Sequence, residues 1–247
     1  MPAAEILDTL CRHLIEGIQE NIIELVTYGR GQARRESVEN EVIIGKALQS
    51  FTRGHPMFQG DLSFAVATNG SWYDFVVRSA DGTTFVPINL KVSTLQGQDN
   101  VASKAGLFYA LTGVMPSNPL IRNWEEFCRN LANSLQREGC EADYYFLVVE
   151  KSREGVGRVF WTSLLRLRMV KPNGSNPPFQ ACWQENQEHS GRSREDAIDY
   201  LLETLGETFA LRAKALDSFR AHLVPTLANE RRARWQAGVP HVEGETD

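Results

Sequence analysis

The sequence predicts a mixed α/β domain in which helices flank a central sheet that contains an antiparallel meander. Three observations predict this class. Apolar residues recur at helical intervals in the first 51 residues, strand-like composition follows at 61–92, and helix and strand patterns then recur in irregular order to about residue 223. We expect one domain over 1–238 and a disordered tail at 239–247, because 247 residues of ordinary composition suffice for a single core.

The N-terminal half begins with two predicted helices. Residues 4–27 place apolar side chains three and four apart, which predicts a long amphipathic helix that either supports the domain or mediates dimerisation. The polar segment 28–37 has two glycines and three arginines, so we expect a loop or a mobile arm there. A second helix is predicted at 38–51. Strands follow at 61–92, with turns at the Asn-Gly pair 69–70 and the Asp-Gly pair 81–82.

The C-terminal half alternates helix and strand patterns without a regular repeat. Helices are predicted at 100–112 and at 123–138, where Asn123 is the expected N-cap. A last helix is predicted to start near Ser193 and to end near residue 223. Between these helices the sequence predicts, in order, a strand at 144–151, a strand at 158–167, a loop at 171–178 and a strand at 179–186.

Composition excludes several classes of function. A net charge of −5 argues against a protein that coats nucleic acid non-specifically, although arginine clusters leave specific DNA binding open. The four cysteines show no metal-binding or disulfide spacing, and we interpret them as reduced structural thiols. The sequence has no membrane-spanning stretch, no secretory leader and no phosphate-binding glycine motif, so we expect a cytoplasmic protein without ATP dependence.

The segment "WYDFVVRSADGTTFVPINLKVS" predicts a hairpin with polar residues on one face. A turn at 79–82 would pair Arg78 with Thr83 and place Asp74 opposite Pro87, with Asn89 as its diagonal neighbour. Because strand side chains alternate, Asn89 shares a face with Pro87 and Lys91, while the intervening apolar residues form core. Pro87 also predicts a sheet edge or a bulge.

A carboxylate and an amide oxygen beside a lysine suit phosphodiester hydrolysis. Oxygen donors hold Mg²⁺, and the lysine can orient and help to deprotonate an attacking water. The alternative interpretation is a solvent-facing strand pair with no catalytic role.

With these residues, the sequence resembles the PD-(D/E)XK nucleases, and within them the type II restriction endonucleases of the EcoRV and HincII kind. Asp74 is followed by "NLK" at 89–91, where the family has an acidic residue, any residue and lysine. Glu41, in the helix upstream, matches a further acidic position, with Glu39 a second candidate. The polar loop "STLQGQDN", the helix after it and the late helix "RSREDAIDYL" continue the likeness, a layout that is also similar to SwaI.

The resemblance implies a restriction-endonuclease-like fold and a homodimer that cuts double-stranded DNA at a symmetric sequence with Mg²⁺, for which Mn²⁺ can substitute. It also implies a cognate DNA methyltransferase in the same system, though not as a physical partner. The implied catalytic residues are Asp74, Asn89, Lys91 and Glu41. The implied metal ligands are Asp74, Asn89, Glu41 and the backbone carbonyl of Leu90.

Asn89 departs from the family pattern, because a neutral amide binds Mg²⁺ more weakly than a carboxylate. Three explanations stay open at this point: a nuclease with a natural asparagine, a DNA-binding protein that has lost catalysis, and an engineered inactive variant. Tyr73 also stands where the family name has proline.

Two loops are candidates for reading bases, since Gln and Asn can pair with adenine in the major groove. Both are also interpretable as ordinary solvated turns. Together with basic residues that suit phosphate contacts, the predicted DNA-binding residues are Arg34, Arg35, Gln96, Gln98, Asn100, Lys104, Lys171, Asn173, Ser175 and Asn176.

Overall fold

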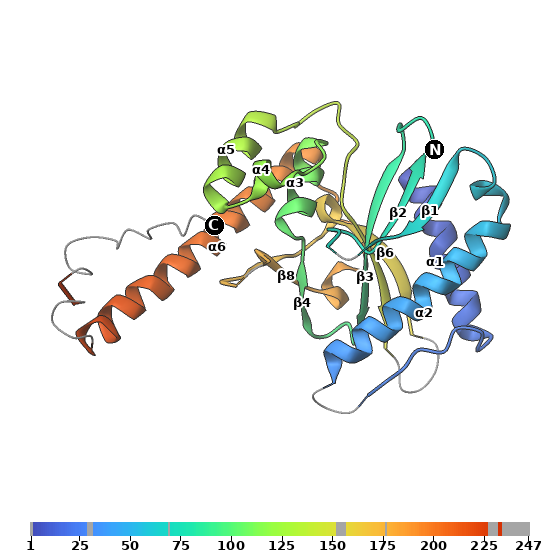
Figure 1. The fold of residues 1–247 in the computed structure, drawn as a ribbon, viewed down its shortest axis with the longest axis horizontal. Helices are drawn as coiled ribbons and strands as arrows, with labels where there is room; N and C mark the ends of the chain where they lie inside the picture. The colour runs from blue at the N-terminus through green and yellow to red at the C-terminus, as the bar shows by residue number, and fades with distance from the viewer. Residues whose placement is uncertain are drawn as a thin grey trace, which may run out of the picture.

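A five-stranded mixed sheet forms the centre of the computed structural model (Figure 1). Its strands lie in the order β1-β2-β3-β5-β6, with β3 and β5 parallel and the other neighbours antiparallel. The strands are β1 (Leu62–Val66), β2 (Phe75–Ser79), β3 (Phe85–Ser93), β5 (Tyr145–Glu150) and β6 (Val159–Ser163). The predicted mixed α/β class, with an antiparallel meander β1-β2-β3, is confirmed. The structure describes residues 2–28, 32–68, 70–151, 157–175, 177–226 and 232–233.

Helices cover both faces of the sheet (Figure 1). Two of them, α1 and α2, lie on one face, and the later helices lie on the other. None of the described helices is long and apolar enough to span a membrane. The helices are α1 (Ala3–Gln19), α2 (Ala33–Gly54), α3 (Lys104–Thr112), α4 (Asn118–Ile121), α5 (Trp124–Ser134) and α6 (Arg194–His222).

A second, smaller sheet packs beside α3 and α6. It has the antiparallel order β4-β8-β7, with β4 (Gln98–Val101), β8 (Phe179–Cys182) and β7 (Lys171–Pro172). Val101, Phe179 and Ala181 face the core, so Asn100 and Gln180 face outward. The sequence predicted a loop at 93–100, and that prediction is wrong for β4, because its polar residues gave no strand signal.

Helix α1 ends eight residues before its predicted end. Asn21 takes a left-handed conformation with φ of 56°, which stops the helix. The chain then folds back so that Ile23 packs on Gly17, where a Cβ atom would lie 2.6 Å from Ile23 Cδ1. Ile23 is therefore buried beside the helix instead of continuing it.

Helix α2 begins five residues earlier than predicted, so Arg34 and Arg35 belong to its first turn and not to a mobile arm. Asn40 fixes the preceding chain, because its side-chain amide accepts from the Val26 N–H at 2.8 Å and donates to the Val26 carbonyl at 2.9 Å. Buried Glu36 accepts from the Tyr28 N–H and pairs with Lys151. These bonds hold α2 in place over the sheet.

The two faces of the sheet are packed separately. On the α1–α2 side, Leu10, Leu14 and Ile44 are fully buried with the inward residues of β2 and β3. On the other side, Phe146 and Trp183 lie at the centre of the core formed with α3, α5 and α6. Helix α1 buries its apolar residues inside this chain. The structure therefore favours a role in supporting the domain over a role in dimerisation.

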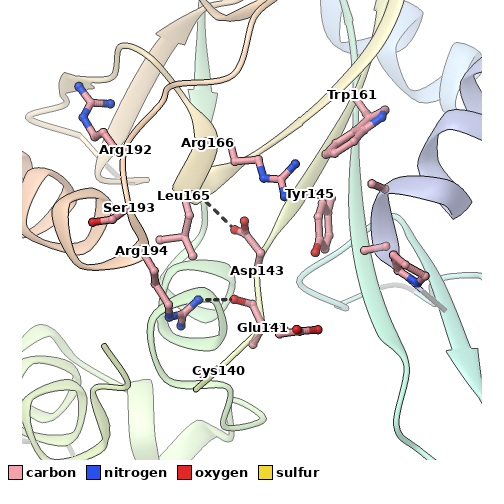
Figure 2. A pocket seen from close by; sticks show the side chains of 14 residues that line it. Cys140, Glu141, Asp143, Tyr145, Trp161, Leu165, Arg166, Arg192, Ser193 and Arg194 are labelled. Atoms are coloured by element: carbon pink, nitrogen blue, oxygen red, sulfur yellow. Dashed lines mark hydrogen bonds between the residues drawn. The ribbon is translucent and has the colours of Figure 1, made fainter. Parts of the chain in front are cut away.

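A cavity of about 470 Å³ opens between α1, β5 and the start of α6 (Figure 2). Two charged side chains that line it, Asp143 and Arg194, are hydrogen-bonded to the backbone of the same chain. Asp143 accepts from the backbone N–H groups of Tyr144 at 2.8 Å and Leu165 at 3.2 Å, and Arg194 donates to three backbone carbonyls. Burial raises the pKa of Asp143 to about 6, although these N–H groups and the charge of Arg194 oppose the rise.

Asn40→Ala is expected to destabilise the fold by about 2 kcal/mol, because the Val26 N–H and carbonyl lose their partner. Urea unfolding followed by circular dichroism measures this. Ser37→Ala, an exposed change on the same helix, is the control and should shift the free energy of unfolding by less than about 0.5 kcal/mol. Equal effects of the two changes would contradict the role given to Asn40.

Asp143→Asn is expected to remove a pH dependence of stability. The folded protein holds this proton more tightly than the unfolded chain, so the contribution is complete below about pH 4 and is lost as pH rises toward 6. The free energy of unfolding of the wild type should therefore fall by up to about 3 kcal/mol relative to that of the variant between pH 4 and 6. Urea unfolding at one-unit pH steps gives the difference; a constant difference would refute the shift.

Candidate active site

Asp74 lies one residue before β2 and is bound to β3 through both backbone and side chain. Its N–H donates to the Ile88 carbonyl at 2.9 Å, and its Oδ2 accepts from the Leu90 N–H at 2.7 Å. The N–H and carbonyl of one strand residue point to the same side, so the Leu90 carbonyl also faces the Asp74 side. Two oxygen groups of the predicted set therefore lie on the same edge of β3.

The predicted register of the hairpin is wrong by two residues. Arg78 pairs with Phe85 instead of Thr83, and Val76 lies opposite Pro87. The turn is longer than predicted because Asp81 accepts hydrogen bonds from Ser79 and Thr83 and stabilises a wider loop. An even shift keeps every side chain on its predicted face.

Pro87 lies in a central strand, but at a position that is paired on one side only, in agreement with the predicted edge. The pairing of β3 with β5 begins one residue later, at Ile88 opposite Tyr145. Pro87 therefore lacks an N–H at a position where β5 provides no partner, and it costs the ladder no hydrogen bond.

Asn89 and Lys91 project from β3 away from the α1–α2 core, as predicted, because Val86, Ile88 and Leu90 are buried there. The Asn89 Oδ1 atom is buried and has no hydrogen-bond partner among the described residues. An unpaired buried amide oxygen is costly, so this atom is a candidate to receive a ligand.

Glu41 lies on α2 and is partly buried. Burial raises the pKa of Glu41, the charge of Asp74 raises it further, and Lys91 opposes the rise. The charges of Asp74 and Lys91 thus act on Glu41, although α2 packs on the face of the sheet opposite to Lys91. Glu39, the second candidate, is engaged elsewhere, because it pairs with Arg35 at 2.9 Å and accepts from the Tyr28 hydroxyl.

The electrostatics of the site suit proton transfer. Burial raises the pKa of Asp74, opposed by the Leu90 N–H and by Lys91. Burial lowers the pKa of Lys91, opposed by Asp99, Asp74 and Glu41. Within the described chain Lys91 forms no ion pair, so its amine is available for a bound molecule.

Asp74, Asn89 and Lys91 line one cleft of about 540 Å³. Asn100, on β4, and Lys104, at the start of α3, line it as well. Trp72 and Tyr144 form its aromatic wall, where the Tyr144 hydroxyl donates to the Trp72 carbonyl at 2.7 Å. The cleft thus joins three of the four predicted catalytic residues to one of the predicted base-reading segments; Glu41 does not line it.

The residues of this cleft fit a weakly held Mg²⁺ ion. In the described part of the chain, no three His, Cys, Asp or Glu side chains lie close enough together to hold an ion. Asp74 is the carboxylate that lines the cleft, so an ion held there would also need the unpaired Asn89 Oδ1 and the Leu90 carbonyl. All of these donors are oxygens, which Mg²⁺ prefers.

Asp99 is a site residue whose role the sequence did not indicate. It lies on the core-facing side of β4, where its Oδ2 accepts from Trp183 Nε1 at 2.6 Å. It is the carboxylate that most strongly favours the charged form of Lys91. Only the pairing of β4 with β8 brings it there, and no local sequence pattern predicts that pairing.

The predicted base-reading residues divide into separate groups. Gln98 and Asn100 are exposed on β4, but Gln96 lies at a different groove beside Arg158 and Gln187. Lys171 and Ser175 are exposed at the β7–β8 hairpin. Asn176 and the side chain of Arg34 lie outside the described residues.

Asn173 is not available for base contact as predicted, because it is buried. Its Nδ2 donates to Pro177 O at 2.8 Å and to Asn100 Oδ1 at 3.1 Å, and its Oδ1 accepts from the Ser175 N–H. A side chain whose donors and acceptor are all engaged inside a loop holds the loop together. We therefore assign Asn173 a structural role.

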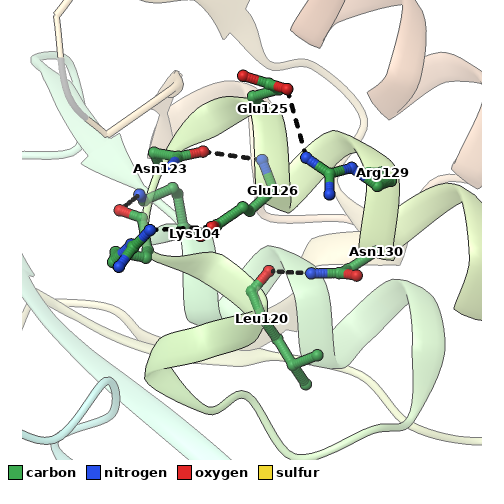
Figure 3. Close-up of polar contacts among 8 residues, drawn as sticks. Lys104, Leu120, Asn123, Glu125, Glu126, Arg129 and Asn130 are labelled. Atoms are coloured by element: carbon green, nitrogen blue, oxygen red, sulfur yellow. Dashed lines mark hydrogen bonds and ion pairs between the residues drawn. The ribbon is translucent and has the colours of Figure 1, made fainter.

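The predicted phosphate contacts Lys104 and Arg35 are both partly engaged. The Lys104 ammonium donates to the Arg122 carbonyl at 2.9 Å and lies 5.4 Å from the centre of the Trp124 ring, at the α4–α5 connection (Figure 3). Arg35 pairs with Glu39 and lies over the Tyr28 ring. Both remain partly or fully exposed, so neither is excluded from a phosphate contact by burial.

The chain was compared with protein-family models and with curated proteins. No protein-family model matches the chain, and no curated protein matches it significantly.

Asn89→Asp is expected to tighten Mn²⁺ binding to the free protein by about tenfold, because it adds a charge to the donor set. Titration followed by the electron paramagnetic resonance of free Mn²⁺ measures the affinity. Asn133→Asp, exposed on α5, is the control for net charge and should leave the affinity unchanged. The same affinity in all three proteins would argue against a metal site at Asn89.

Proposed function

We propose that this protein is a Mg²⁺-dependent endonuclease that hydrolyses phosphodiester bonds in double-stranded DNA at a symmetric sequence. The main observation in support is that Asp74, Lys91 and Asn89, whose side-chain oxygen is unpaired, line one cleft together with Asn100. Glu41 on α2 interacts electrostatically with Asp74 and Lys91. The segment before β2, strand β3 and strand β4 thus converge on one cleft. This convergence supports a reaction centre better than a solvated hairpin face.

Each residue has a role in this proposal. Asp74, Glu41, Asn89 and the Leu90 carbonyl hold the metal ion. Mg²⁺, when bound, supplies positive charge for the phosphate oxygens. Lys91 orients the attacking water and accepts its proton, which its lowered pKa favours.

The second candidate is a DNA-binding protein that keeps this site without cutting. Asn89 is the observation in its favour, since the site has one carboxylate fewer than the family pattern that the sequence resembles. Asp99 does not replace that charge directly, because its carboxylate is held by Trp183 on β4. Whether the unmodified chain cleaves DNA decides between the two candidates.

Two-fold symmetric DNA favours a homodimer, because each subunit then reads one half-site and cuts one strand. The apolar face of α1 is buried inside this chain, so the dimer contact in this proposal lies on other elements. A cytoplasmic location and a cognate methyltransferase belong to the same proposal.

The proposal predicts discrete fragments when the protein is incubated with plasmid and Mg²⁺. Sequencing of the fragment ends would give the site and the cut position. A smear, or no cutting even with Asn89→Asp and Mn²⁺, would count against a nuclease. Specific binding without cleavage would favour the second candidate, and failure to retard any duplex at low salt would favour a protein that does not bind nucleic acid.

Lys91→Met is expected to reduce cleavage at least 100-fold while cognate binding changes less than about threefold, because the lysine acts on water and not on bases. Asp74→Ala should have the same effect through loss of metal. Lys46→Met, an exposed lysine on α2, is the matched control and should cut at the wild-type rate. Gel-resolved cleavage and binding in Ca²⁺ separate the two effects.

A further inference from the structure

The outward face of the small sheet carries a row of polar side chains. Asn100 on β4 pairs with Gln180 on β8, and Gln180 pairs with Lys171 on β7. Directly paired residues share a face, and Val101 and Phe179 occupy the opposite, buried face. Asn100 also lines the cleft that contains Asp74 and Lys91. The row therefore begins at the candidate active site.

The orientation of the Asn173 amide is fixed by the backbone. Its Nδ2 donates to the Pro177 carbonyl and its Oδ1 accepts from the Ser175 N–H, so the two ends cannot be exchanged. The Asn173 backbone N–H donates to Pro178 O and lies 3.2 Å from Thr208 Oγ1, which anchors the residue to α6. Asn173 is thus a rigid donor aimed at β4.

This fixed donor sets the two amides next to it. Asn100 Oδ1 accepts from Asn173 Nδ2 at 3.1 Å and from Gln180 Nε2 at 3.3 Å. Each amide end is assigned by its partner. Among the described residues, no hydrogen-bond partner occupies Asn100 Nδ2 or Gln180 Oε1. The surface therefore presents the N–H donors of Asn100 Nδ2 and, beside them, the carbonyl acceptor of Gln180.

We propose that Asn100 and Gln180 together read one adenine in the major groove of the DNA that the proposed nuclease cuts. Adenine presents N7 as an acceptor and the N6 amino group as a donor. Asn100 donates to N7 and Gln180 accepts from N6, while Lys171, next in the row, contacts a phosphate. Asn173 acts as a positioning residue. This inference rests on the proposed function.

A donor next to an acceptor also fits the guanine O6 and cytosine N4 groups of one G·C pair. Adenine is favoured because both of its groups belong to one base, as the two amides belong to one hydrogen-bonded pair. A preference for G·C at the position that these residues read would overturn the assignment.

The test starts from the full-length wild-type protein and a randomised duplex library, selected by binding in Ca²⁺. The cognate duplex is then remade with 7-deazaadenine, which lacks the N7 acceptor, or with unsubstituted purine, which lacks the N6 amino group, at each adenine in turn. At one adenine, wild type should lose about 10- to 100-fold in affinity with either analogue. Asn100→Ala should bind the 7-deazaadenine duplex as tightly as it binds the unmodified duplex. Gln180→Ala should likewise bind the purine duplex as tightly as it binds the unmodified one.

Gln59→Ala, at an exposed glutamine beyond α2, is the control and should keep the full sensitivity to both analogues. Asn173→Asp should lose the preference at the same adenine, because a carboxylate cannot donate to Asn100. Circular dichroism verifies the folding of each variant. If Asn100→Ala and Gln180→Ala lost equal affinity for cognate and scrambled duplexes, the adenine assignment would be overturned, but the proposed function would not. Absence of any preferred duplex for wild type would overturn it together with the proposed function.

Discussion

The hydrogen bond from the Leu90 N–H to Asp74 Oδ2 is the contact on which the arrangement of the site depends. It orients the one carboxylate that reaches β3 directly, and it fixes which face of β3 that carboxylate meets. The parallel pairing of β3 with β5 then keeps Asn89 and Lys91 on one face of the sheet, and Glu41 on α2 interacts with Lys91 electrostatically. Each of these elements is tied by buried bonds, including those of Asn40, so the polar groups meet without a flexible segment between them.

The same cluster shows how desolvation and charge act against each other. Burial disfavours the charged forms of Glu41, Asp74 and Lys91, while attraction between Lys91 and the acids partly restores them. The result is a group of residues whose pKa values depart from their ordinary values, next to an amide oxygen that lacks a partner. A folded protein keeps such groups at a cost in stability, which supports a functional reason for their presence.

The sequence predicted those features that alternation and periodicity determine. The α/β class, the meander, the face shared by Asn89 and Lys91, and the capped helices α5 and α6 all follow from local patterns. The hairpin register was not predictable, because the Asp81 side chain widens the turn. The small sheet, Asp99 and Gln180 were missed because β4 meets β8 about 80 residues along the chain. Asn173 was predicted to contact a base, because the residues next to it in the sequence do not indicate that it is buried.

Alternation in the small sheet has a consequence for how the protein can diverge. Stability depends on one set of positions, which includes Val101, Phe179 and Ala181, and the outward row occupies the other set. Substitutions in the outward row leave the packed set intact, so descendants of this chain can exchange outward side chains and remain folded. The catalytic strand, which has core on one side and the cleft on the other, lacks that freedom. Related proteins should therefore differ first along the outer row and last along β3.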